Sequence, residues 1–233
     1  MKFPLITVML SIGVSLCACT PNTPWSSKEY RHDYINTMTK KAKQGNVEAQ
    51  LFVGIMYEKG MGLDKDEAKA VRWYRKAAEQ GSAAAQSMLG RAYAEGYGVA
   101  KNEVEAMKWF RKAAESELQG FSNQPFLFAG GYEGAIKSAE DGNELAKTIV
   151  GKMYLTGSGV SQNDVEAVRW LTAGTKGFAA AGAQQALGIL HEDGRGGLAK
   201  DKAEAMRLYR KAAEQEASNL ESSVGIVYQF GPM

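Results

Sequence analysis

Small and apolar residues recur at helical spacing in two successive stretches of the chain. In the first stretch, Ala49, Val53 and Tyr57 lie four positions apart, which places them on one face of a helix. The second stretch carries a corresponding stripe at Ala70, Trp73, Tyr74, Ala77 and Ala78. Glycines at 60 and 62 separate the two stretches. The pattern predicts a pair of helices joined by a short turn, and therefore an all-α fold.

The pair of stretches then repeats along the chain at near-regular intervals. The framework positions of the first copy are Gly45, Ala49, Gly54, Tyr57, Gly60, Gly62, Ala70 and Trp73. They return 36 residues later as Gly81, Ala85, Gly90, Tyr93, Gly96, Gly98, Ala106 and Trp109. Further copies read Gly142, Ala146, Gly151, Tyr154, Gly157, Gly159, Ala167 and Trp170, then Ala183, Gly188, His191, Gly194, Gly196 and Ala205. Such regular self-similarity predicts an alpha-alpha superhelix, a solenoid of stacked helical hairpins.

The predicted helix ends are also repeated. Asp66, Asn102, Asn163 and Asp201 stand at equivalent positions before the second helix of each copy, where an Asx side chain can accept from free backbone N–H groups. Glycine at 60 and its counterparts follow the first helix, because glycine takes left-handed backbone angles without steric cost. Most of the eye-catching acids and glycines are therefore structural.

The segment from Gly45 to Gly81 closely resembles the Sel-one-like repeat, a helical hairpin related to the tetratricopeptide repeat. The resemblance extends over roughly residues 42–231 and depends on about a dozen spaced positions per copy. Members of that family mostly act as interaction scaffolds. The resemblance therefore implies protein partners, and it leaves the particular role open.

Three regions depart from the repeat and define the domain organisation. Residues 28–44 predict an N-terminal capping helix, and the solenoid follows over 45–233. Near 116–141 the pattern decays, since Gly81 and Gly142 are 61 residues apart where two full copies would take 72. Residues 217–230 resemble the first helix of a further unit that ends as a half repeat. Its apolar face is either an uncovered contact surface or simply a cap.

The first residues resemble a bacterial export signal with a lipobox. A charged start and an apolar run precede Leu16-Cys17-Ala18-Cys19. This arrangement predicts a signal peptide over 1–18, lipid attachment at Cys19 and a tether over 19–27. Thr20 after that cysteine implies an outer-membrane lipoprotein, facing the periplasm. The alternative is an ordinary cleaved signal without a lipid.

Composition excludes some classes of function. The mature chain has no cysteine after Cys19, so it cannot form an internal disulfide. This separates it from cysteine-rich relatives with reported penicillin-binding or β-lactamase activity. The whole chain has 28 basic and 26 acidic residues. So balanced a charge argues against nucleic acid, whose binding depends on clustered Lys and Arg.

The sequence offers little catalytic chemistry. It has only two histidines, His32 in the capping helix and His191 in the place of a framework tyrosine. Neither His-x-x-x-His nor a cysteine pair is present for a metal, and no nucleophile, base and acid can be grouped. We therefore expect no cofactor, no metal and no enzymatic activity. The alternative is a cell-wall-active or β-lactam-binding enzyme that uses two of the many carboxylates.

Candidate partner-binding residues are those that the repeat leaves unexplained. Leu51, Ile55, Arg91, Lys152 and Ile189 occupy variable positions on the first helices, turned away from the packed stripe by helical geometry. First helices line the concave side of tetratricopeptide-like stacks, so we expect these residues to form a partner groove. Their alternative role is ordinary solvent exposure.

Phe126 and Phe128 in the shortened unit are further candidates, because aromatic residues are enriched in interface cores. Packing inside a bend is their alternative. Together these features predict a non-catalytic, membrane-tethered scaffold that binds proteins of the bacterial envelope. A more specific hypothesis is a periplasmic immunity protein that neutralises a secreted toxic effector.

Overall fold

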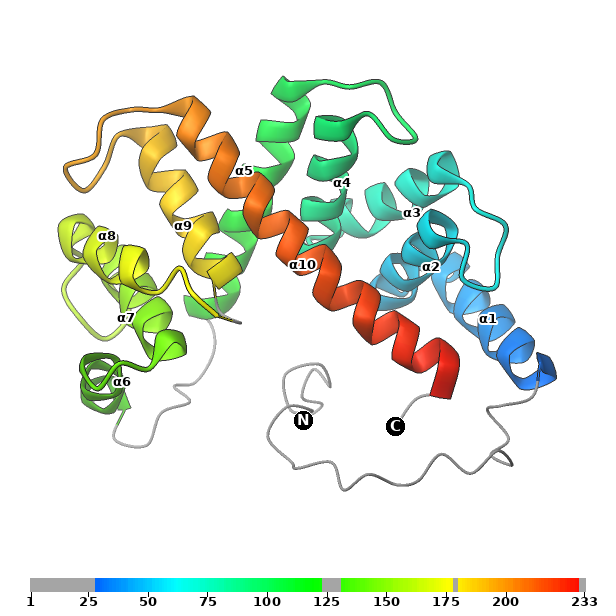
Figure 1. Ribbon diagram of the computed structural model, residues 1–233, viewed down its shortest axis with the longest axis horizontal. Coiled ribbons are helices and arrows are strands. Elements are labelled where there is room, and N and C mark those ends of the chain that lie inside the picture. The colour runs from blue at the N-terminus through cyan, green and yellow to red at the C-terminus, as the bar shows by residue number, and fades with distance from the viewer. Residues whose placement is uncertain (1–27, 123–130, 178–179, 231–233) are drawn as a thin grey trace.

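The computed structural model describes residues 28–122, 131–177 and 180–230, and all the regular secondary structure within these segments is α-helix (Figure 1). The first five helices are α1 Lys28–Lys43, α2 Val47–Lys59, α3 Glu67–Glu79, α4 Ala83–Glu95 and α5 Glu103–Ser122. The next five are α6 Gly131–Glu140, α7 Glu144–Thr156, α8 Asp164–Ala173, α9 Ala180–Asp193 and α10 Lys202–Phe230. The prediction of an all-α repeat fold is confirmed. None of the described helices is long and apolar enough to cross a membrane.

The four sequence copies form four antiparallel helix pairs: α2 with α3, α4 with α5, α7 with α8, and α9 with α10. In each pair a glycine of the first helix faces a large side chain of the second. A Cβ atom on Gly90 would lie 2.6 Å from Phe110 Cδ1, and one on Gly151 would lie 2.6 Å from Leu171 Cγ. The framework glycines at these positions thus allow the two helices to approach closely.

The predicted helix ends are confirmed. Asp66 Oδ1 accepts from the Lys69 N–H at 2.8 Å, and Asn163 Oδ1 accepts from the N–H groups of Val165 and Glu166. Gly60 ends α2 with φ of 71°, in the left-handed region that glycine favours. The repeated local signals therefore specify where each helix begins and ends.

The helices form two stacks, α1–α5 and α6–α10 (Figure 1). The connection between the stacks falls in 123–130, so the candidates Phe126 and Phe128 lie outside the described residues. α6 packs on α7 as α1 packs on α2, and a left-handed glycine follows each of them: Gly142 with φ of 97° and Gly45 with φ of 95°. Within the described residues, the shortened unit near 116–141 thus comprises the end of α5, residues 116–122, and α6.

The two stacks meet through α5, α9 and α10. The rings of Phe110 and Tyr209 stack with centroids 6.2 Å apart, and Ile189 is buried in the same apolar cluster. At the edge of this contact, Arg111 Nη1 lies 2.7 Å from Asp193 Oδ1. The second and fourth repeats are therefore direct neighbours in space.

α10 differs from the prediction that a separate helix begins near residue 217. It continues without interruption for 29 residues, from the second helix of the last repeat to Phe230. The physical reason is local: Glu216 replaces the turn glycine found at Gly81, and Ala217 replaces the helix cap found at Ser82. Without a left-handed residue and without a new cap, the chain stays helical.

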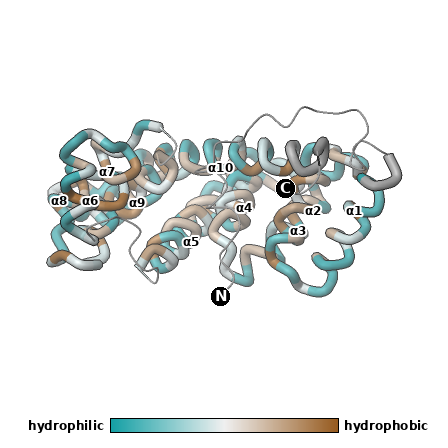
Figure 2. Tube along the Cα trace, turned by 90° about the horizontal axis from the view of Figure 1, so that it is seen from below, coloured by the Kyte–Doolittle hydropathy of each residue, from teal (hydrophilic) through white to brown (hydrophobic). Residues whose placement is uncertain are grey.

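The long α10 crosses back over the first stack (Figures 1 and 2). Its N-terminal half packs on α9, and its C-terminal half contacts α4 and α2. The apolar side chains at 217 and 224 belong to the same buried cluster as residues of α2, α3 and α4. The last helix of the chain therefore covers first helices that a regular solenoid would leave open.

Candidate functional site

The strip of candidate partner residues does not form an open surface in the structure. Ile55, Lys152 and Ile189 are 2%, 5% and 4% exposed, and Leu51 and Arg91 are partly buried. The expectation of a solvent-open strip is wrong for the three buried residues, because α10 and neighbouring helices pack over the first helices. The structure brings Leu51, Ile55 and Arg91 together beside α10, whereas Lys152 lies in a central cluster and Ile189 at the contact between the stacks.

We call the part of α2 and α4 beneath the C-terminal half of α10 the groove floor; it comprises Leu51, Ile55, Lys59, Met88 and Arg91. Its apolar part is formed by Leu51 and Ile55, which lie in one cluster with Ala217, Leu220 and Val224 of α10. Ala217 and Val224 are 3% and 5% exposed. A stripe of small and apolar residues on α10 thus fills the apolar part of the groove floor.

The charged part of the groove floor faces an acidic residue of the same helix. Lys59 Nζ lies 2.7 Å from Glu221 Oε1, and Arg91 Nη2 lies 4.0 Å from that oxygen. Arg91 is also 2.7 Å from Glu58 Oε1, and the buried Tyr74 hydroxyl donates to Glu58 Oε2 at 2.8 Å. Glu58 therefore holds the guanidinium in place, while Lys59 and Arg91 together present positive charge to α10.

A second polar cluster, which we call the central node, lies where α10 passes α4, α5, α7 and α9. It consists of Ser87, Glu117, Lys152, Gln185 and Glu216. Gln185 Nε2 donates to Glu216 Oε1 at 2.7 Å, and Lys152 Nζ lies 3.0 Å from Glu117 Oε1. Both glutamates stand where the repeat has a turn glycine, and both lie within unusually long helices.

The carboxyl group of Glu216 is buried, which disfavours its negatively charged form. Burial raises the pKa of Glu216 to about 7, and the negative charge of Glu117 acts in the same direction. Hydrogen bonds from Ser87 and Gln185 and the positive charge of Lys152 act in the opposite direction. The protonation of Glu216 consequently changes near neutral pH, at the point where the two halves of α10 join.

Among the described residues, open hollows lie next to both halves of α10. The first lies beside the groove floor and is lined by Glu58, Lys59, Lys65, Glu67, Arg91, Glu95 and Tyr97. The guanidinium of Arg91 lies 5.3 Å from the centroid of the Tyr97 ring, and burial raises the pKa of the Tyr97 hydroxyl. This hollow extends the charged part of the groove floor toward solvent.

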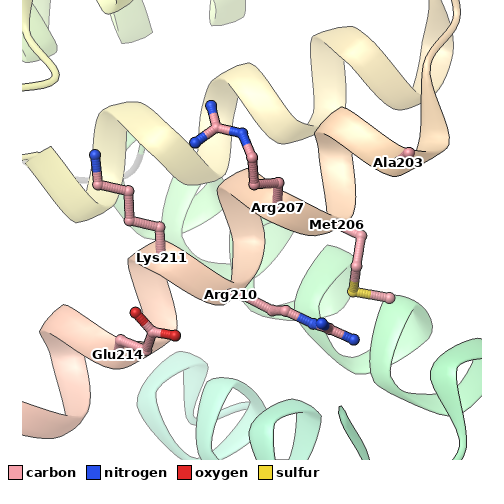
Figure 3. A pocket seen from close by; sticks show the side chains of 6 residues that line it. All are labelled: Ala203, Met206, Arg207, Arg210, Lys211 and Glu214. Carbon is pink, nitrogen blue, oxygen red and sulfur yellow. The ribbon is translucent and has the colours of Figure 1, made fainter.

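The second hollow lies along the N-terminal half of α10 (Figure 3). Arg207 and Lys211 point to one side of the helix, and Met206 and Arg210 point to the other. Arg207 pairs with Glu204 at 2.6 Å, and Arg210 lies 3.2 Å from Glu103 of α5. Since acids already neutralise two of its cations, this hollow does not form a strong anion site.

The described residues do not contain a group of three or more His, Cys, Asp or Glu side chains that could hold a metal. His191 lies in α9, in the place of a framework tyrosine, and its backbone carbonyl accepts from the Asp201 N–H at 2.8 Å. The contacts at the groove floor and the central node are ion pairs and hydrogen bonds between helices. Such an arrangement suits recognition of a helix more than covalent chemistry.

Sequence reasoning did not find the α10 residues that complete the site. Glu216 had a usable signal, because it replaces a glycine in the same position as Glu117 does in the second copy. Glu221 and Lys59 had no such signal, since nothing local indicates that they meet. Their pairing depends on the path of α10 across the first stack.

These features define a helical-repeat protein of the solenoid class with a self-covered groove. A sequence model described as the Sel1 repeat matches residues 47–82, 83–117, 145–175 and 181–216, which together make up more than half of the chain. The chain belongs to the Sel1 repeat family. Sel1 repeats generally mediate protein–protein interaction.

Two solved structures are similar to this chain. A Sel1 repeat protein from Oxalobacter formigenes is 28% identical, with 87% of this chain and 84% of that chain covered and a TM-score of 0.39. The protein c5321, a protective antigen present in uropathogenic Escherichia coli strains, is 32% identical, with 86% of this chain and 45% of that chain covered and a TM-score of 0.38. No curated protein matches the chain.

Proposed function

We propose that this protein is a non-catalytic scaffold that binds other proteins in the bacterial envelope. Membership in the Sel1 repeat family supports the general class of function. The groove floor supports the mode of binding, because Leu51 and Ile55 offer apolar area and Lys59 and Arg91 offer charge on one continuous surface. That combination, already engaged by an amphipathic helix of the same chain, is the observation on which the proposal depends.

The envelope setting is a separate part of the proposal. The charged start, the apolar run and the Leu16-Cys17-Ala18-Cys19 sequence support export and lipid attachment at Cys19. Cys19 and the segment before it lie outside the described residues. Thr20 supports delivery to the outer membrane, with the repeats facing the periplasm.

Replacement of the lipid-bearing sulfur tests the anchor. We expect the wild-type protein to incorporate labelled palmitate and to sediment with outer membranes. Cys19→Ser removes the sulfur but keeps the size of the side chain, so the variant is expected to lose the label and leave the membrane fraction. Equal sedimentation of both proteins, with no label in either, would contradict a lipid anchor.

Cross-linking in intact cells tests the scaffold role. Lys59→Glu reverses a charge of the groove floor, whereas Arg72→Glu reverses an exposed charge on α3 and serves as the matched control. We expect the wild type and Arg72→Glu to capture one defined partner in similar amounts. With Lys59→Glu, the amount of captured partner is expected to fall at least about fivefold. Absence of any specific partner from all three proteins would contradict the scaffold role.

The identity of the captured protein then refines the function. A secreted toxic enzyme as partner would select the immunity role, and a resident envelope protein would select a regulatory or structural role. Hydrolysis of peptidoglycan or a β-lactam by the purified mature protein would contradict the non-catalytic assignment.

A further inference from the structure

The C-terminal half of α10 occupies the groove floor in the manner of a bound ligand helix. Its inward stripe consists of Ala217, Leu220 and Val224, spaced by three and four residues, and Glu221 lies beside that stripe. The apolar stripe belongs to the same apolar cluster as Leu51 and Ile55, and the carboxylate of Glu221 pairs with Lys59. The chain itself therefore shows which helix pattern fits this surface.

The outward face of the same segment makes it a weak helix by itself. Ser218, Asn219, Ser222 and Ser223 are exposed, and these residue types have low helix propensity. The hydroxyl groups of Ser222 and Ser223 donate to the carbonyl oxygens four residues earlier, at 2.8 and 2.9 Å, and such back-bonding weakens helices. The C-terminal half of α10 is therefore helical mainly because it packs on the groove floor.

Two further features favour release of the segment. Gly225 lies in the helix interior, although a Cβ atom there would meet nothing within 4 Å, so packing does not require glycine. Glu216 places a buried carboxyl group at the junction between the two halves of α10. The N-terminal half, by contrast, is the second helix of a repeat and packs along α9.

We propose that residues 217–230 are a displaceable internal occupant of the groove floor, and that the partner is an amphipathic helix that replaces them. The partner helix carries small or apolar residues at the spacing of Ala217, Leu220 and Val224, and a carboxylate in the register of Glu221. Lys59 and Arg91 recognise that carboxylate. The internal segment competes with the partner at an effective concentration in the millimolar range, as expected for a tethered ligand.

The experiment uses the purified mature protein and a fluorescent peptide of residues 214–230 as the probe. Asn219→Pro breaks α10 at an exposed position and leaves every residue of the groove floor unchanged. We expect the peptide to bind this variant at least about tenfold more tightly than the wild type, because the internal competitor is removed. Val224→Asp, which places a charge in the buried apolar cluster that also contains Ile55, is the second variant and is expected to act in the same direction.

Charge exchange tests recognition of the carboxylate. A Glu221→Lys peptide is expected to bind Asn219→Pro at least about tenfold more weakly than the unaltered peptide. Adding Lys59→Glu to the protein is expected to recover part of the lost affinity for the Glu221→Lys peptide. The same change is expected to lower the affinity for the unaltered peptide. The proposal is overturned if the peptide binds wild type and both variants equally, if it binds none of them, or if charge exchange has no effect.

This inference rests on the proposed scaffold function, but its test is independent of it. The peptide assay examines the groove floor in purified protein, whereas the scaffold role depends on capture in cells. A negative peptide result combined with specific capture would move the partner site to another face and leave the scaffold role intact.

Discussion

Lys59 of α2 and Glu221 of α10 form an ion pair with a Nζ to Oε1 distance of 2.7 Å, which joins the first repeat to the C-terminal half of α10. The pair is only partly shielded, since the two side chains are 32% and 30% exposed. An exposed pair contributes little stability, about 1 kcal/mol or less. The contact therefore fixes the register of α10 on the groove floor more than it stabilises the fold.

The first prediction concerns this register. Glu221→Lys places two positive groups together near Arg91, so the segment 217–225 is expected to open more often. Hydrogen–deuterium exchange of its amides should accelerate about tenfold, while amides of α7 and α8 remain unchanged. Asn219→Lys, which adds charge on the exposed face of the same turn, should leave the exchange of the segment close to that of the wild type.

The second prediction concerns the pH dependence of stability. The pKa of Glu216 is about 7 in the folded protein, whereas an ordinary glutamate has a pKa of 4.5. Between these two pH values the folded state therefore binds more protons than the unfolded state. The stabilisation is complete below about pH 4.5 and is lost as pH rises through about 7. Glu216→Gln keeps a neutral group in place and should raise stability at pH 8 by about 3 kcal/mol.

Denaturant unfolding at pH 5 and pH 8 measures this effect. The difference in the free energy of unfolding between the wild type and Glu216→Gln should be larger at pH 8 than at pH 5. Glu214→Gln, at an exposed position two residues earlier on the same helix, is the matched control and should show no such growth. A constant difference at both pH values would exclude Glu216 as the source.

The third prediction concerns Lys152 in the central node. Its positive charge lowers the pKa of Glu216, and it pairs with Glu117 at 3.0 Å. Lys152→Met keeps the length of the side chain but removes the charge, so the pKa of Glu216 should rise further. The pH at which stability falls should shift upward relative to wild type, whereas Lys147→Met on the same helix should not shift it.

The fourth prediction compares two helical glycines. A Cβ atom at Gly90 would lie 2.6 Å from Phe110 Cδ1, so Gly90→Ala should destabilise the protein by about 2 kcal/mol through overpacking. Gly225→Ala meets no atom within 4 Å and should stabilise α10 by about 1 kcal/mol. Gly90→Ala should therefore lower the midpoint of thermal unfolding and speed amide exchange in residues 217–225. Gly225→Ala should raise the midpoint and slow that exchange.

Local sequence signals were sufficient for most of the fold. Asp66 and Asn163 cap their helices, and Gly60 ends α2, because these effects depend on residues within one or two turns. The same local effects explain Glu216, where the absence of a glycine and of a cap lets one helix continue, although the repeat pattern predicted a new helix from residue 217. The residues at 216 and 217 therefore decide whether the chain forms a separate helix from residue 217 or continues as one long α10.

The candidate site was less predictable than the fold. The variable positions at 51, 55 and 91 do lie together, since helical geometry places them on one side of the first helices. Their burial beneath α10 depends on contacts between residues far apart in the sequence, such as Lys59 with Glu221. A single sequence contains no local signal for such contacts.

In the proposal above, a partner helix and the C-terminal half of α10 share the groove floor. A photo-cross-linking amino acid at position 51, used in intact cells, tests this most directly, with position 72 on the exposed face of α3 as control. We expect an internal link from position 51 to residues 217–225 in the wild type, and in Asn219→Pro a decrease of that link with a matching increase of an adduct to one partner protein. Equal adducts from positions 51 and 72, or no change of the adducts in Asn219→Pro, would show that the partner does not bind at the groove floor.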